Sequence, residues 1–437
     1  MQRAHWASAH WPSGQRASPS MSARAPRSLR RTAPWRTAIA TCLALLGWAA
    51  APAAYAQFNG SFALDERHLN YENWLDWRAY QHPPEWRTDA YRQPNSMRAS
   101  VGSLSQVRFY EDYEIRLEKE LGPYAAILYT QNEVSLFRSN PPYQEAEMRF
   151  GANGLYASII GFPNSDKSLG SQGGAVAWGK RTEPNTVRLS YLQEQALFNE
   201  KTEGTARYAI APILNRFQAR FSPGERVRIE VDYRDEPTAR LLSPDLRKQE
   251  TYLAQKFDGW VDWSVRDDLV LGLVASDNTE RRQFIPDAGS PGPPPREQSL
   301  TWGWSEVHGV WTLAGGDVLT LAVVQSAFEN IIQAPDPLVA YRFRLRTTQA
   351  YALWEVLRSA WFRWTFSLQV GEVNKFLPTS SDDAERNDSP TIRGKFGFGV
   401  ILAEEHQYRL WLLSTWAPDA ISGQKWDGGN MQFQLFF

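Results

Sequence analysis

The chain ends in NMQFQLFF, residues Asn430 to Phe437, and this stretch decides how the rest of the sequence is interpreted. In an extended strand, Met431, Phe433, Leu435 and Phe437 would lie on one face and two glutamines on the other. Alternation with a period of two predicts a β-strand whose two faces meet different surroundings. Because chain ends are usually polar and frayed, this aromatic end predicts a strand that is held in a sheet.

The same alternation recurs along the chain. It is clear in RVRIEVDY at 226–233, AYRFRLR at 340–346, WFRWTFSLQV at 361–370 and TIRGKFGFGV at 391–400. These strands run to roughly 10–18 residues, whereas strands of globular proteins are mostly about 5–6 residues long. A soluble β-sandwich also alternates, but about 9–11 tilted residues suffice for a strand to cross a bilayer. The lengths therefore favour an all-β protein that crosses a membrane with strands.

The first 56 residues read as an export signal. A basic segment at 27–36 precedes an apolar segment at 37–51, and small residues surround Tyr55 before Gln57. This order predicts a secretory signal peptide over residues 1–56, cleaved after Ala56. Translation from Met21 would give a signal peptide of ordinary length. In that alternative, residues 1–20 are not part of the protein.

Composition excludes several classes of function for the exported part. Residues 1–56 hold seven arginines, no acid and the one cysteine, so the remainder has 40 basic and 48 acidic side chains, a net charge of −8. That balance argues against nucleic acid as a partner, because nucleic-acid-binding domains present a basic face. Without cysteine, neither disulfides nor thiolate chemistry is available. No His, Asp and Glu spacing predicts a metal site, and no cofactor is expected.

Short and long connections alternate along the chain. Eight short connections carry turn residues, at Gly122-Pro123, Asn153-Gly154, Pro184, Pro223-Gly224, Asp267, Gly315-Gly316, Ser359 and Glu405. Longer polar segments lie between them, for example at 138–144, 278–298 and 377–390. Asn-Gly and Gly-Gly are typical hairpin turns. Short turns on one side and long loops on the other predict a transmembrane antiparallel up-and-down β-barrel over residues 57–437.

The alternating strand that ends in Phe437 resembles the C-terminal signature of Gram-negative outer-membrane β-barrels. The resemblance extends over about residues 57–437 through architecture. It implies an outer-membrane location, lipid around the barrel, and recognition of Phe433, Leu435 and Phe437 by the barrel-assembly machinery. The chain is also similar in size and arginine content to eighteen-stranded alginate-export barrels, as an analogy only.

Parity predicts the number of strands. Eight tight turns on one side, with both chain ends on that side, predict 18 strands. The first strand is then expected near Gln57–Leu64 and a long first outer loop at Asp65–Pro94. Sixteen strands is the alternative, with the N-terminal strand inside the lumen. In the first loop, Trp74, Trp77 and Trp86 are candidates for stacking against sugars, although interfacial aromatics are equally expected there.

No catalytic group is predicted. His308 in SEVHGVW is the one candidate base for a serine hydrolase in the barrel wall, with Ser305 and Glu306 nearby. Nucleophile and base must lie within hydrogen-bonding reach, and Ser305 and His308 fall on opposite faces of one strand. The sequence therefore predicts a protein that is not an enzyme, with an outer-membrane hydrolase as a less favoured alternative.

Cationic side chains opposite the apolar stripes are the remaining functional candidates. The pore-lining candidates are Arg216, Arg220, Arg226, Arg228, Arg342, Arg344, Arg346, Arg363, Arg393 and Lys395. Rings of arginine or lysine select anions in pores. The sequence therefore predicts an outer-membrane pore or export channel for anionic or sugar-like solutes. The alternative is a non-conducting structural or binding barrel whose lumen is plugged by its loops or by a partner.

Overall fold

The computed structural model describes residues 95–437 except 106–107, 135–142, 163–169, 181, 197–205, 225, 244–247, 287–294, 336–340, 379–384, 388–390, 405–407 and 417–425. The expected signal peptide, first strand and first loop, with Trp74, Trp77 and Trp86, lie outside the described residues. Among the described residues, no helix is long and apolar enough to cross a membrane.

Twenty strands make up the described part of the chain. They are β1 (Ser96–Ser105), β2 (Arg108–Glu120), β3 (Ala125–Val134), β4 (Tyr143–Ala152), β5 (Leu155–Phe162), β6 (Ser171–Trp178), β7 (Thr186–Gln193), β8 (Arg207–Ile210), β9 (Ile213–Phe221), β10 (Val227–Ser243), β11 (Lys248–Arg266), β12 (Leu269–Pro286), β13 (Arg296–Thr312), β14 (Val318–Gln333), β15 (Tyr341–Ser359), β16 (Phe362–Pro378), β17 (Glu385–Asn387), β18 (Thr391–Glu404), β19 (Tyr408–Trp416) and β20 (Trp426–Phe436).

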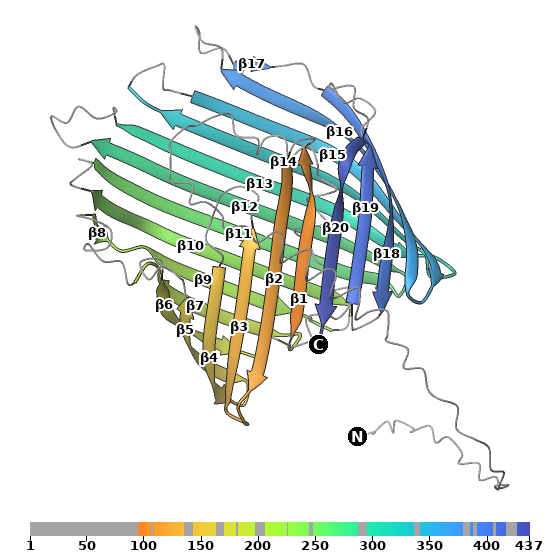
Figure 1. Cartoon of the computed structure of the whole chain (residues 1–437), viewed down its shortest axis with the longest axis horizontal. Helices are drawn as coiled ribbons and strands as arrows, with labels where there is room; N and C mark the ends of the chain where they lie inside the picture. Colours follow the sequence, from red (N-terminus) through yellow and green to blue (C-terminus); the bar gives the residue numbers. More distant parts are fainter. Residues whose placement is uncertain are drawn as a thin grey trace, which may run out of the picture. The chain divides into compact units, whose positions relative to one another are not determined.

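Eighteen of these strands form a closed antiparallel ring in chain order (Figure 1). The two short strands, β8 and β17, are not part of the ring, because β7 pairs directly with β9 and β16 pairs directly with β18. The ring closes where β20 pairs with β1, seen in Figure 1 as dark blue beside orange. The expected up-and-down barrel of eighteen strands is confirmed, in place of the alternative of sixteen.

The expected position of the first strand is wrong. The ring begins with β1, which pairs with β2 on one side and with β20 on the other, so Gln57–Leu64 has no place between them. Only Gln106 and Val107 separate β1 from β2, and neither is a turn-forming residue type. Without a turn signal there, the sequence does not show that residues 96–120 form two strands, β1 and β2, before the turn at Gly122.

The turns support the expected layout. Asn153 and Gly154 connect β4 to β5 with φ values of 55° and 82°, the left-handed conformation of a tight hairpin turn. At the opposite end the strands reach further than expected. The sequence predicts a loop over residues 278–298, but β12 continues to Pro286 and β13 begins at Arg296.

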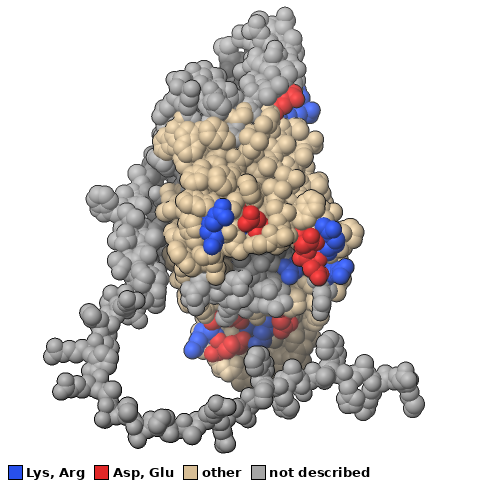
Figure 2. All heavy atoms as spheres, turned by 90° about the vertical axis from the view of Figure 1, so that its right-hand side faces the viewer, with Lys and Arg blue, Asp and Glu red and all other residues tan. Residues whose placement is uncertain are grey.

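The outer face of the ring carries an exposed apolar belt. It includes Ile159, Val176, Leu189, Leu273, Val307, Val323, Trp354, Leu368, Phe398 and Leu412. In the view of Figure 2 the described surface is mostly uncharged, with basic and acidic residues lying together in a few small groups. A closed antiparallel ring with such a belt is a transmembrane barrel of the outer-membrane type, because closure leaves no open strand edge in the lipid and apolar side chains face the acyl chains.

The long strands extend beyond this belt at the end opposite the tight turns. Across β14, β15 and β16, the last row that is apolar on all three strands is formed by Val323, Ala350 and Val370, which are neighbours in register. The next outward row is Gln325, Thr348 and Glu372, and further out Ala327 and Ile331 alternate with polar residues. Since long loops lie on the outer side of such barrels, this part of the wall projects from the outer leaflet.

Candidate functional site

The inner face of the ring is the candidate site. On β13, Val307 and Trp311 are exposed on the belt side, whereas Glu306 and His308 are buried. Because successive side chains of a strand point to opposite sides, residues in alternation with the belt face the lumen.

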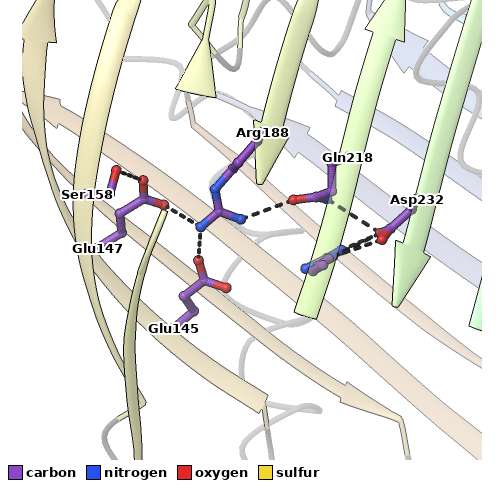
Figure 3. Close-up of polar contacts among 7 residues, drawn as sticks. Glu145, Glu147, Ser158, Arg188, Gln218 and Asp232 are labelled. Carbon is purple, nitrogen blue, oxygen red and sulfur yellow. Dashed lines mark hydrogen bonds and ion pairs between the residues drawn. The ribbon is translucent and has the colours of Figure 1, made fainter. Parts of the chain in front are cut away.

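One arc of the lumen is a hydrogen-bonded charge network, drawn in Figure 3. Arg188 on β7 lies at its centre and donates to Glu145 at 2.8 Å, to Glu147 at 3.0 Å and to Gln218 at 3.0 Å. Ser158 on β5 donates in turn to the other oxygen of Glu147. The side chains of Arg188, Glu145 and Glu147 are each at most 19% exposed, so these ion pairs are largely removed from water.

The network continues around the ring through Gln218 on β9. Its amide donates to Asp232 on β10 at 3.4 Å, and Arg216 binds the same carboxylate with a Nε–Oδ1 distance of 2.9 Å. Further inner ion pairs are Arg149–Glu118, Arg220–Glu230, Lys256–Asp258, Arg363–Glu355 and Arg409–Glu355. The cations of this wall therefore lie beside carboxylates, which largely cancel their charge.

An ion pair also lies at the mouth formed by the tight turns. Lys180, in the connection between β6 and β7, donates to Glu120 at 2.8 Å. This hydrogen bond raises the pKa of Lys180, so the amine stays charged at neutral pH. In the turn after β7, toward the other mouth, burial raises the pKa of the Glu194 carboxyl.

The other half of the ring carries a cluster of buried apolar and aromatic residues, set among polar inner residues such as Glu355 and Gln369. The members of the cluster, on β12–β15, β18 and β19, are Val274, Trp304, Ala322, Val324, Tyr351, Leu353, Ile401, Trp411 and Leu413, with Trp260 and Trp302 packed against them. The indole of Trp411 donates to Thr365 on β16 at 3.4 Å. We call this set the aromatic arc. Since the charge network lies mainly on β4–β10, the two arcs occupy different halves of the ring.

His308 lies beside the aromatic arc between two carboxylates. Its Nε2 is 3.2 Å from Asp262 on β11, and its Nδ1 is 2.9 Å from Glu306 on its own strand. Gly272 stands between His308 and Asp262 in register, and a Cβ there would lie 2.1 Å from His308 Nε2. Glycine therefore permits the contact across β12. The sequence shows Glu306 beside His308 but gives no sign of Asp262 as a partner, and Ser305 is exposed on the other face, as expected.

Four of the residues predicted to line a pore lie on the inner face of the ring. Arg216, Arg220 and Arg228 share the inner face with Asp232, and Arg363 contacts inner Glu355. Arg226 lies in the turn before β10 and is exposed. Arg393 and Lys395 belong to β18, but their side chains lie outside the described part.

The prediction that Arg342, Arg344 and Arg346 line the lumen is wrong, because these side chains point outward. They alternate with buried Phe343, Thr347 and Gln349, and they share their face with exposed Trp354. Inner Phe343 packs edge-on against Phe328 of β14, with ring centroids 6.1 Å apart. The arginines stand above the apolar belt, where the outer face meets polar surroundings. Apolar residues therefore mark the inner face in this part of β15 and the outer face lower down.

Several outer-membrane proteins of solved structure are similar to this chain at low TM-scores. No protein-family model matches the sequence, and no curated protein matches it. A loop L8 deletion mutant of OmpT, an outer membrane protein of Vibrio cholerae, shares 9% identity at a TM-score of 0.37, over 78% of this chain and 97% of that one. The translocator domain of the autotransporter NalP from Neisseria meningitidis shares 8% identity at 0.32, over 84% and 98%. OccAB2 of Acinetobacter baumannii shares 7% identity at 0.33, over 78% and 96%. At these TM-scores the similarities carry no argument about fold or function.

Proposed function

We propose that this outer-membrane barrel is a narrow channel for sugar-like, hydroxylated solutes. The observation that carries the proposal is the two-sided lumen, with hydrogen-bonding ion pairs around Arg188 and an aromatic arc on the other half of the ring. A sugar ring has hydroxyl groups at its edge and C–H groups on its faces. It can therefore bond to charged groups and lie against aromatic rings at the same time.

The charge pairing supports an uncharged solute over an anion. An anion-selective constriction needs cations whose field reaches the ion, and the inner arginines here lie beside carboxylates. The burial of inner side chains supports a narrow passage, since Arg149 and Trp304 are each only 5% exposed. The same burial is the observation that favours the second candidate, a non-conducting barrel with a filled lumen.

Single-channel recording in planar bilayers tests the channel. The purified protein is expected to conduct less than a wide general-diffusion porin in the same salt, and maltohexaose is expected to reduce the current. Replacing inner Trp302 with alanine should raise the maltohexaose concentration that blocks half of the current by roughly three- to tenfold. This is the change in affinity expected for the loss of one aromatic contact. Outward Trp354→Ala is the matched control and should leave the block unchanged.

Two results would count against this function. Absence of current would favour the filled barrel. Stronger block by an anionic oligosaccharide of equal length, such as oligogalacturonate, would favour an anion channel over a neutral sugar channel.

We also propose that the outward residues Phe433, Leu435 and Phe437 are read by the barrel-assembly machinery. Phe437 is 59% exposed, and its backbone N–H donates to Asn95 at 3.1 Å, a bond that any residue except proline can make. Phe437→Lys should therefore fold as well as the original chain in lipid vesicles, yet give much less folded barrel in cells. Equal yields in cells would show that the phenylalanine is not a recognition element.

A further inference from the structure

The outward arginines of β15 form a charged patch directly above the apolar belt. The patch consists of Arg342, Arg344 and Arg346 with Glu329 of β14. One oxygen of Glu329 accepts from Arg342 at 3.2 Å and from Arg344 at 2.9 Å. Three guanidiniums and one carboxylate leave a net charge of +2, and exposed Glu372 on β16 reduces it to +1.

The patch stands at the level of lipid headgroups. Ala350 lies in the last apolar row, and Arg346 follows four residues further along the same face. At a rise of about 3.4 Å per residue and a tilt near 45°, Arg346 is about 10 Å above the hydrocarbon edge. Headgroups begin at that edge, and arginine side chains readily bend toward such an interface.

We propose that this patch binds the phosphate groups of an outer-leaflet glycolipid. Guanidinium groups bind phosphate with paired hydrogen bonds. Three of them at every second position of one strand can follow a headgroup that carries more than one phosphate. Below the patch, Ala350, Ala352 and Trp354 continue the same face as an apolar surface for the acyl chains. This inference is independent of whether the lumen conducts.

The arginines keep access to such a ligand. The side chain of Arg342 is 45% exposed and that of Arg344 is 22% exposed, so both can be reached from outside although they contact Glu329. A surface that serves only to end the apolar belt needs no excess of positive charge. On the neighbouring strands the same height is occupied by neutral Ala327 and Asn374.

Binding of bisphosphorylated lipid A to the detergent-solubilised full chain tests the proposal. The triple variant R342Q/R344Q/R346Q should bind at least about tenfold more weakly, because charge-assisted hydrogen bonds are lost. Arg358→Gln, on the same face at the other end of β15, is the matched control and should bind as the original chain does. Glu329→Gln should bind several-fold more tightly, and this opposite shift also tests the site if the triple variant folds poorly.

Two comparisons separate the possible ligands. Lipid A without phosphates should bind much more weakly, and millimolar inorganic phosphate should not displace the intact lipid. Equal binding by the triple variant, or equal binding of the dephosphorylated lipid, would overturn the proposal. Displacement by inorganic phosphate would replace the lipid with a simple anion and would overturn it as well.

Discussion

A chain truncated after residue 425, and so without β20, is expected to yield no closed barrel. β20 pairs over nine positions with β19 and over seven with β1, so its loss opens both ladders at once. Each backbone N–H and C=O left at the new edges inside the membrane would cost several kcal/mol, because lipid offers no partner. The heat-modifiable band of the folded barrel on unboiled gels should disappear.

Trp426→Ala is the matched control for this truncation. It removes a large side chain from β20, together with the 3.0 Å hydrogen bond of its indole to Ser414, but it keeps the backbone pairings. Folded protein should therefore remain abundant. A truncated chain that still ran as a heat-modifiable, protease-resistant band would show that the ring can close without β20.

Sequence periodicity predicts the ring well because each membrane strand meets two different environments. Alternation along 226–233 or 361–370 follows directly from lipid on one side and the lumen on the other. Turn residues add the hairpin positions, and together they are sufficient for the strand count. The exception is the link at Gln106 and Val107, which has none of the usual turn residues. For this reason the predicted position of the first strand is wrong.

Periodicity cannot tell which of two faces is the inner one. On β15 the outward positions near the long connections hold arginines, whereas those within the apolar belt hold Ala350, Ala352 and Trp354. The expectation that apolar residues point outward therefore holds for only part of this strand. The reason is that the strand leaves the hydrocarbon layer part-way along its 19 residues. Above that point, Phe343 packs inward against Phe328, and the outer face is free to be charged.

Contacts between strands are equally hidden from the sequence. His308 and Asp262 are 46 positions apart, and they meet because register aligns both with Gly272. The same holds for Arg188 and Glu145, which are 43 positions apart. The register between two strands depends on all of their paired residues. Contacts of this kind therefore cannot be predicted from single residues in the sequence.

Arg188→Gln is expected to change both the ion preference and the stability of the barrel. It leaves the largely buried carboxylates of Glu145 and Glu147 without their shared cation. Removing one partner of a buried ion pair typically destabilises by about 3–5 kcal/mol. The midpoint of guanidinium unfolding in lipid vesicles should fall accordingly.

The same change should make the lumen prefer cations. In a potassium chloride gradient across a planar bilayer, the reversal potential should move toward the potassium equilibrium potential. The triple variant E145Q/E147Q/R188Q removes two negative charges and one positive charge. It should move the reversal potential back past the original value toward the chloride equilibrium potential, because this group of side chains is then one charge more positive than in the original chain.

Arg342→Gln separates this effect from a general change in charge. It removes the same single positive charge, but from the outward patch beside Glu329, where 45% of the arginine side chain is exposed. A charge on the outer face is separated from the lumen by the barrel wall and is screened by salt beyond about 10 Å at 0.1 M. Its reversal potential should therefore stay as in the original chain. An equal shift for Arg342→Gln and Arg188→Gln would mean that inner and outer charges act alike on permeating ions. The inner network around Arg188 would then not control ion passage.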